Sequence, residues 1–205
     1  MFFVFEGADG VGKSTQAKLL AEHLTAVHRS KVLLLREPGG THLGEQVRKI
    51  LLDPATGDLE TATELFLFMA ARAHLTARKI LPALARGEVV VCDRYLWSSV
   101  VYQGIVGGLG ISDVLRAGRL AGAVPPTRTF VIDIPPQVAA GRMDGEDRME
   151  SRGRSFQDGV RRGFLQLARR YPRNVAVIDG RGTPAEVHRK VLDRLPVRGW
   201  SACRP

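Results

Sequence analysis

The octapeptide GADGVGKS, from Gly7 to Ser14, decides how the rest of the sequence is interpreted. It fits the pattern G-x-x-x-x-G-K-[ST], and it lies between an apolar run at residues 2–5 and a segment with helical periodicity at residues 13–27. Glycines let backbone N–H groups approach phosphate oxygens closely, and the start of the following helix favours an anion. The motif therefore predicts a bound nucleoside triphosphate, with Lys13 at its outer phosphates and the Ser14 hydroxyl on Mg²⁺.

Around this motif, short apolar runs alternate with helical segments, which predicts an α/β fold with a parallel sheet flanked by helices. Nearly continuous apolar runs predict about five strands, each buried on both faces, at residues 2–5, 32–35, 88–92, 129–134 and 175–178. Helices are expected over residues 13–27, 44–52, 58–84, 137–143, 156–171 and 184–195. The Gly-rich stretch 102–110 and residues 144–155 are expected to be mobile loops within a single domain spanning residues 1–205.

The composition is that of a globular chain, with 44% hydrophobic and 25% charged residues among 205. No run of 18 apolar residues exists, and the N-terminus lacks the pattern of a signal peptide. Two cysteines are too few for a disulfide framework and lack metal-ligand spacing. We therefore expect a cytoplasmic protein that does not bind a membrane.

The chain is strongly basic, with a formal net charge of +9 that falls almost entirely in its second half. Residues 1–102 carry 12 basic and 11 acidic side chains, whereas residues 103–205 carry 18 and 10. Nine of the basic residues are arginines between Arg142 and Arg173, and a guanidinium group grips phosphate bidentately. This cluster is compatible with phosphate contacts and equally with a solvated helix face.

A second motif, VVVCDRY at residues 89–95, narrows the class of P-loop protein. An apolar strand ends in Asp93, where such folds place a carboxylate that holds Mg²⁺ through water. Arg94 follows and would face the phosphates at the carboxyl end of the strand. No guanine-reading NKxD-type stretch follows the P-loop, and the chain is small for a motor, so the motifs favour phosphoryl transfer between small nucleotides.

Further motifs in the same order carry a family resemblance: REPGGT at residues 36–41, FMAAR at 68–72, DRYLWSSVVYQG at 93–104, VIDIPP at 131–136 and DRME at 147–150. With these motifs the chain resembles bacterial thymidylate kinases over nearly its whole length. The resemblance implies a P-loop nucleoside monophosphate kinase-like fold with a mobile lid at about residues 142–155. It also implies transfer of the γ-phosphate of ATP to dTMP, giving dTDP and ADP, in a cytoplasmic homodimer.

Phe68 and Arg72 support this assignment independently, because residues four apart on a helix share one face. An aromatic ring can stack on a base while the guanidinium donates to its edge. Thymine presents a carbonyl oxygen at its 4-position where cytosine presents an amino group. Arg72 would therefore donate a hydrogen bond to the carbonyl oxygen of thymine. With cytosine, the donors of Arg72 would face the donors of the amino group.

The resemblance also implies two nucleotide sites and a set of catalytic residues. The dTMP site would consist of Asp9, Glu37, Pro38, Phe68, Arg72, Arg94, Ser99, Tyr102 and Gln103. The ATP site would consist of Gly7, Ala8, Asp9, Gly10, Val11, Gly12, Lys13, Ser14, Thr15 and Arg142. The catalytic residues would be Lys13, Arg94, Arg148 and Asp9, with Mg²⁺ held by Ser14 and Asp93, and the peptide bond before Pro38 is a candidate for the cis form.

Some relatives carry an arginine within the P-loop, where this chain has Gly10. The cation that neutralises the transferred phosphoryl group is therefore expected from the arginine-rich lid, with Arg148 as first choice and Arg152 and Arg154 as alternatives. On this interpretation the basic excess of the second half serves catalysis rather than nucleic-acid binding.

Two other functions stay open at this point. The first is a P-loop kinase for another nucleotide or a deoxynucleoside. The second is a basic nucleic-acid-binding P-loop protein, although Phe156, Phe164 and Tyr171 have the spacing of a buried helical stripe rather than of stacking platforms. The five histidines show no clustering in the sequence, and none is assigned a catalytic role.

Overall fold

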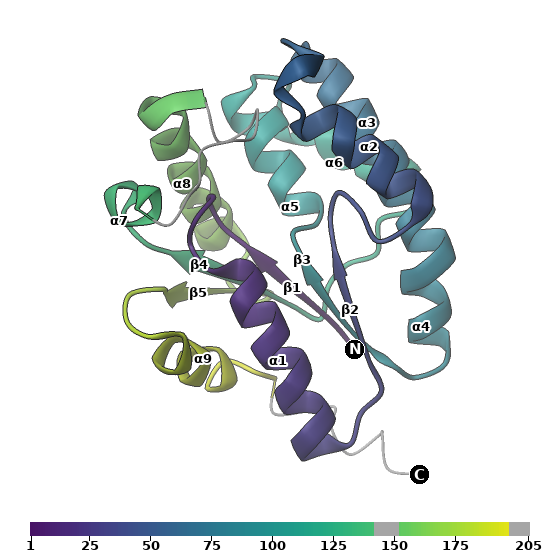
Figure 1. Ribbon diagram of the computed structural model, residues 1–205, viewed down its shortest axis with the longest axis vertical. Coiled ribbons are helices and arrows are strands. Elements are labelled where there is room, and N and C mark those ends of the chain that lie inside the picture. The colour runs from purple at the N-terminus through teal and green to yellow at the C-terminus, as the bar shows by residue number, and fades with distance from the viewer. Residues whose placement is uncertain (142–151, 197–205) are drawn as a thin grey trace.

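The computed structural model describes residues 1–141 and 152–196, which build one five-stranded parallel sheet covered by helices (Figure 1). The strands are β1 (Phe2–Glu6), β2 (Val32–Arg36), β3 (Val89–Asp93), β4 (Arg128–Asp133) and β5 (Val175–Asp179). Their order across the sheet is β2-β3-β1-β4-β5. The predicted α/β fold class is confirmed, and all five strands begin and end within about two residues of the apolar runs.

Helices cover both faces of the sheet (Figure 1). Helices α1 (Lys13–His28) and α9 (Pro184–Leu192) pack together on one face. The remaining α-helices of the described chain are α2 (His42–Leu52), α3 (Thr61–Leu75), α4 (Leu81–Ala85), α5 (Leu96–Ser99), α6 (Ile111–Leu120), α7 (Pro136–Ala140) and α8 (Gly153–Arg170). Three short segments connect them: the 3₁₀ turn η1 (Pro54–Thr56) and the π-helical segments η2 (Thr76–Ile80) and η3 (Val100–Val106).

The strand order places the P-loop at the topological switch point of the sheet. The chain leaves β1 toward β2 and β3 on one side and later adds β4 and β5 on the other. Ligands of open α/β sheets bind in the crevice at the carboxyl ends of the strands where this reversal occurs. In the register of the sheet Phe5 of β1 lies beside Asp93 of β3, so the P-loop and the DRY motif emerge at the same edge.

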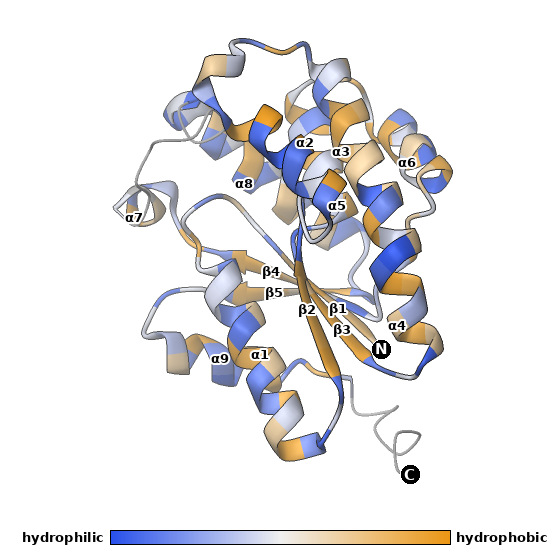
Figure 2. Cartoon of the chain, turned by 45° about the vertical axis from the view of Figure 1, so that its right-hand side comes forward, coloured by the Kyte–Doolittle hydropathy of each residue, from blue (hydrophilic) through white to orange (hydrophobic). Residues whose placement is uncertain are grey.

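Burial differs between central and edge strands. Every residue of β1 is buried, and the strands are among the most hydrophobic segments of the chain (Figure 2). The prediction of burial on both faces is wrong for β2 and β5, where Leu34 and Val177 are 45% and 43% exposed, because these strands form the two edges of the sheet. Apolar side chains of the central strands form the core that holds the P-loop edge rigid.

The expectation of a mobile loop over residues 102–110 is wrong for its first half. Residues Val100–Val106 continue α5 as a buried π-helical segment, and the sequence analysis also missed α6 after it. A Cβ atom on Gly107 would lie 2.4 Å from Thr61 Cγ2 and 2.9 Å from the backbone oxygen of Gln103. Here glycine permits close packing of helices rather than a flexible loop.

Residues 142–151 and 197–205 lie outside the described residues. This applies to most of the predicted lid, including Arg142 and Arg148. Within the described ranges, none of the helices combines the length and the apolar character that crossing a bilayer requires.

Candidate active site

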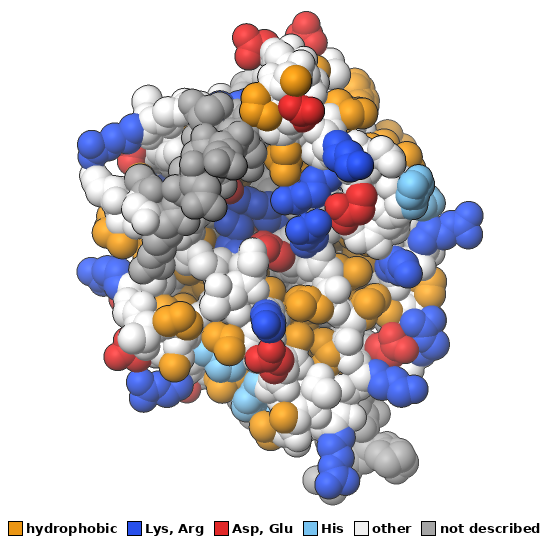
Figure 3. Space-filling view, in the orientation of Figure 1, with side chains coloured by type: hydrophobic (Ala, Val, Ile, Leu, Met, Phe, Trp, Pro, Cys, Tyr) orange, Lys and Arg blue, Asp and Glu red, His pale blue; other side chains and the backbone are white. Residues whose placement is uncertain are grey.

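A cleft of about 710 Å³ opens at the carboxyl edge of the sheet. Figure 3 shows lysine and arginine side chains gathered where this face of the molecule is hollowed. Most of the predicted site residues line it: Asp9, Gly10, Val11, Gly12, Lys13, Ser14, Thr15, Glu37, Pro38, Phe68, Asp93, Arg94, Ser99, Tyr102 and Gln103. Gly7, Ala8 and Arg72 lie behind this lining.

The P-loop turns sharply from β1 into α1. Gly7, Gly10 and Gly12 all have positive φ, and a Cβ atom on Gly7 would lie 2.5 Å from the backbone oxygen of Ile132. Only glycine fits such a position without strain. The first turn of α1 has no side-chain cap, so its backbone N–H groups face the cleft as anion donors.

Lys13 lies buried in this loop and donates to the backbone oxygen of Ala8 over 2.5 Å. Burial, followed by the positive charge of Arg94, lowers the pKa of Lys13 to about 8. An arriving phosphate would oppose both effects, because a nearby anion favours the ammonium form. The charges of Lys13 and Arg94 therefore favour binding of a polyanion at this site.

Ser14 and Asp93 meet across the cleft floor. The Ser14 hydroxyl donates to Asp93 Oδ2, and within the described ranges Asp93 Oδ1 is buried without a hydrogen-bond partner. A hydroxyl and a carboxylate are hard oxygen ligands of the kind that Mg²⁺ prefers. The predicted metal pair is thus brought together.

Arg94 lines the cleft and has a left-handed backbone conformation, with φ of 67°. Its guanidinium pairs with Asp9 and donates to the backbone oxygen of Gly7 over 3.1 Å. Tyr102 donates its hydroxyl to the other Asp9 oxygen over 2.8 Å, while its ring lies 5.5 Å from the Arg94 guanidinium carbon. Although burial opposes it, the charges of Arg94 and then Lys13 lower the pKa of Asp9 to about 2, so Asp9 is an anion at neutral pH.

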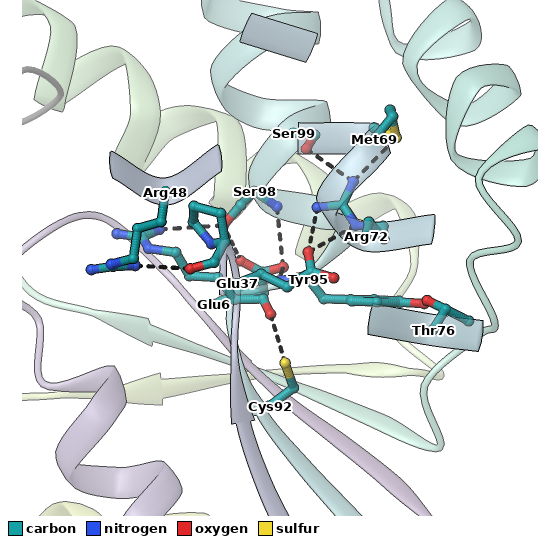
Figure 4. Close-up of polar contacts among 12 residues, drawn as sticks. Glu6, Glu37, Arg48, Met69, Arg72, Thr76, Cys92, Tyr95, Ser98 and Ser99 are labelled. Carbon is teal, nitrogen blue, oxygen red and sulfur yellow. Dashed lines mark hydrogen bonds and ion pairs between the residues drawn. The ribbon is translucent and has the colours of Figure 1, made fainter. Parts of the chain in front are cut away.

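Arg72 lies in the wall behind the cleft and is 1% exposed. Its Nε donates to Glu37 Oε2 over 2.8 Å, its terminal nitrogens contact Glu37 at 2.6 Å and Ser99 Oγ at 3.1 Å, and its guanidinium carbon lies 5.3 Å from the Tyr95 ring (Figure 4). Glu37 and Ser99 line the cleft, whereas Arg72 does not line it and lies in contact with these two residues. The peptide bond between Glu37 and Pro38 is cis, in agreement with the sequence analysis.

Several cleft residues were missed by the sequence analysis. The cations among them are Arg36, at the end of β2, and Arg48, on α2, whose guanidinium donates to the backbone oxygen of Pro38 over 3.1 Å. Arg36 could have been found from the sequence, because it directly precedes Glu37 and Pro38, which were assigned to the site. The other missed lining residues are Gln16, Leu52, Ser98, Gly180, Gly182, Pro184 and Val187.

The loop between β5 and α9 contributes the last part of the cleft. Gln16 on α1 donates to the backbone oxygen of Pro184 over 2.9 Å, which fixes this loop beside the P-loop. The cleft thus has two ends: one between the P-loop and the β5–α9 loop, and one between α3 and η3. Arg94 contacts both, because its guanidinium donates to the backbone oxygen of Gly7 in the P-loop and lies against the ring of Tyr102 in η3.

Arg152, one of the alternative lid cations, lies at the start of α8. Its guanidinium pairs with Glu64 of α3 and lies 5.1 Å from the ring of Phe156. Neither Arg152 nor Arg154 lines the cleft.

The histidines also differ from expectation. His23 and His28 of α1 have ring centroids 5.9 Å apart, and the His188 ring of α9 lies 5.8 Å from His23. They do cluster, at the α1–α9 contact, and none of them lines the cleft.

Most of the chain is similar to known proteins. A family model described as thymidylate kinase matches residues 5–191. The thymidylate kinases of Symbiobacterium thermophilum and Desulforudis audaxviator are 45% and 43% identical, over 93% and 87% of this chain and 90% and 82% of theirs. The crystal structure of thymidylate kinase from Ehrlichia chaffeensis superposes with a TM-score of 0.81 at 33% identity, covering 96% of this chain and 98% of that one.

Proposed function

The chain belongs to the thymidylate kinase family and phosphorylates dTMP to dTDP with ATP, and we propose how its cleft divides this work. ATP binds between the P-loop and the β5–α9 loop, and dTMP binds between α3 and η3. The observation that carries this division is the position of Arg94, a cation at the junction of both ends of one cleft. A donor and an acceptor phosphate held there would lie in line for direct transfer, which needs no protein nucleophile.

The acceptor phosphate is held by arginines. Arg94 is already oriented by the Asp9 carboxylate and the Gly7 carbonyl, so little side-chain freedom is lost when it binds an anion. Arg36 and Arg48 line the same part of the cleft and add charge. Guanidinium groups suit this task because they grip phosphate oxygens bidentately.

The acceptor nucleoside lies against α3 and η3. Phe68 stacks on the base, and Arg72 donates toward its 4-carbonyl from behind the wall. Ser99 and Tyr102 enclose the sugar, and the bulk of Tyr102 leaves little room for a 2′-hydroxyl. Asp9, held as an anion by its neighbours, accepts from the 3′-hydroxyl.

The donor phosphates and their metal lie on the P-loop. We propose that Lys13 contacts the outer phosphates and that Ser14 and Asp93 hold Mg²⁺, partly through water. The buried Asp93 Oδ1, which has no hydrogen-bond partner among the described residues, supports this. Mg²⁺ keeps several waters and binds through one or two side chains together with phosphates. When bound, the ion neutralises charge on the transferred group.

The predicted lid stays a prediction. Arg148 as the cation on the transferred phosphoryl group, and Arg142 as the residue that stacks on adenine, lie outside the described residues. We propose that they act as the family resemblance implies, and that Arg152 does not share the role of Arg148, because it pairs with Glu64.

We further propose a cytoplasmic homodimer. Phe66 on α3 and Leu120 on α6 are 69% and 86% exposed, and large exposed apolar side chains are characteristic of surfaces that a second copy covers. Light scattering coupled to size-exclusion chromatography measures the oligomeric state directly.

ADP release with Mg-ATP over a panel of dTMP, dUMP, dCMP, dGMP and thymidine tests the assignment. We expect dTMP far ahead and dUMP poor, because one methyl group contributes only about 1–3 kcal/mol. The Arg94→Ala variant is expected to lose dTMP turnover. Retained activity of that variant on thymidine would instead indicate a deoxynucleoside kinase, and equal rates on dTMP and dCMP would contradict the role given to Arg72.

A further inference from the structure

A buried carboxylate on α3 has both of its oxygens engaged by residues from other elements. Glu64 is 1% exposed. Its Oε2 accepts a hydrogen bond of 3.1 Å from the amide nitrogen of Gln103 in η3, and its Oε1 pairs with the guanidinium of Arg152 in α8. The guanidinium compensates the buried negative charge, which would otherwise be costly to remove from water.

This contact fixes the orientation of the Gln103 amide. A carboxylate paired with arginine only accepts hydrogen bonds, so the side of the amide that faces Glu64 must be the NH₂ group. The amide oxygen is then on the other side. Gln103 is fully buried in the cleft wall, and among the described residues its Oε1 has no hydrogen-bond partner.

A buried acceptor without a partner is costly unless a ligand supplies the donor. Thymine carries a donor at its ring N3, whereas cytosine carries an acceptor at the same atom. An oxygen fixed toward the base would therefore accept from thymine and oppose an acceptor to an acceptor in cytosine. A freely rotating amide would lack this preference, because it could turn its NH₂ group to cytosine.

We propose that Glu64 is a positioning residue for base selection: it locks the Gln103 amide so that only the oxygen meets the base, with Arg152 as its charge partner. The inference rests on the proposed position of dTMP between α3 and η3. It gives Arg152 a role in nucleotide selection in place of phosphoryl transfer, and it complements Arg72, which would donate to the neighbouring 4-carbonyl.

The test is the Glu64→Gln variant, with Glu60→Gln as matched control. Glu60 precedes α3 by one residue and is exposed, and its carboxylate accepts a hydrogen bond from Thr63, the neighbouring hydroxyl of the same helix end. Its replacement by glutamine therefore makes the same chemical change away from the cleft. Steady-state kinetics with Mg-ATP give kcat and KM for dTMP and dCMP, and thermal unfolding checks that each variant is folded. A glutamine at position 64 can donate as well as accept, so the Gln103 amide is free to turn.

We expect the ratio of kcat/KM for dTMP to that for dCMP to fall roughly 10-fold to 100-fold in Glu64→Gln, mainly through a higher KM for dTMP. Glu60→Gln should match the wild type. In a Gln103→Ala background the Glu64→Gln change should have no further effect on the ratio, because Glu64 acts through Gln103. A folded Glu64→Gln variant with an unchanged ratio, or an equal effect in both backgrounds, would overturn the inference.

Arg152→Met serves as the second variant should Glu64→Gln fail to fold. A reduced ratio of dTMP to dCMP efficiency supports the inference, whereas an equal fall in kcat for both nucleotides refutes it and assigns Arg152 to phosphoryl transfer. A wild-type enzyme without preference for dTMP over dCMP would count against the proposed base site itself rather than against Glu64.

Discussion

Glu6, the last residue of β1, is a buried carboxyl group whose titration should control stability. It is fully buried, and its Oε1 accepts from the backbone nitrogens of Tyr95 and Ser98 over 3.0 and 3.1 Å. Its Oε2 accepts from the Ser98 hydroxyl over 2.6 Å. These bonds tie β1 to the first turn of α5 and to Tyr95, which precedes it (Figure 4). Arg94 directly precedes Tyr95 in the sequence.

Burial raises the pKa of Glu6 from its ordinary value of 4.5 to about 7, against the opposing effects of the Ser98 hydroxyl and the Arg94 charge. The folded chain therefore keeps this proton up to about pH 7, whereas the unfolded chain releases it near pH 4.5. Because the folded state binds more protons between these values, its stability falls as the pH rises through them. At about 1.4 kcal/mol per pKa unit, the contribution lost is about 3 kcal/mol in all, and most of it lies between pH 5 and pH 8.

Glu6→Gln isolates this effect. The glutamine keeps the shape of the side chain and an oxygen for the two backbone donors, but it does not titrate. Denaturant unfolding of both proteins at pH 5 and pH 8 gives two differences in the free energy of unfolding, in which all other titrating groups cancel. We expect the free energy of unfolding of the variant to rise by about 2–3 kcal/mol relative to that of the wild type from pH 5 to pH 8. A difference that is the same at both pH values would refute the reasoning.

Two further predictions concern the P-loop and the α1–α9 contact. Gly7→Ala should lower the free energy of unfolding by roughly 1–3 kcal/mol and raise the KM for ATP, because φ of Gly7 is 138° and an added Cβ has no room. Denaturant titration measures the first effect and steady-state kinetics the second. An unchanged KM for ATP would contradict the assignment of the loop to phosphate binding. Burial, followed by the neighbouring imidazole, lowers the pKa of His23 and of His188 from the ordinary histidine value of 6.5. Below about pH 6.5 the unfolded chain therefore binds more protons than the folded chain, and the free energy of unfolding decreases as the pH falls. His23→Asn should lessen this loss in unfolding experiments from pH 7.5 to pH 5.5, and an unchanged slope would show that the cluster is not its source.

Structural features that depend on consecutive residues were predictable from the sequence. The P-loop and the strand ends were found because close backbone approach and burial leave local signals in glycine spacing and apolar runs. Residues 102–106 were wrongly predicted to be part of a loop, because the glycines of the stretch 102–110 resemble those of a loop. Their reason is distant: a Cβ atom on Gly104 would lie 3.2 Å from Val114 Cγ2, on a helix that the sequence analysis did not expect.

Pairings between distant residues were not predictable for the same reason. The spacing of Phe68 and Arg72 correctly placed both on one helix, but it could not reveal that Glu37, 35 residues earlier, holds the guanidinium inside the wall. Likewise, His23 and His188 lie on separate helices, α1 and α9, which are far apart in the sequence and pack together in the fold. Such contacts depend on the order of the strands, which no local pattern encodes.

The basic charge of the second half illustrates how far composition can mislead. In the described part of the chain, the cations that line the cleft are Lys13, Arg36, Arg48 and Arg94, and all four come from the half with a net charge of only +1. Arginines of the second half instead join structural pairs. Arg161 binds Asp133 of β4 through two hydrogen bonds of 2.7 and 2.9 Å, Arg181 binds Asp179 of β5 at 2.8 Å, and Arg152 binds Glu64.

The expectation that this excess serves catalysis therefore depends on residues 142–151 alone, which contribute two of the 18 basic side chains of that half. A net charge sums over positions, whereas a phosphate site depends on which cations the fold brings to one edge of the sheet. Four cations that line one cleft at the carboxyl edge of the sheet are enough to attract a polyanion strongly, because the low-dielectric walls screen them less than water would.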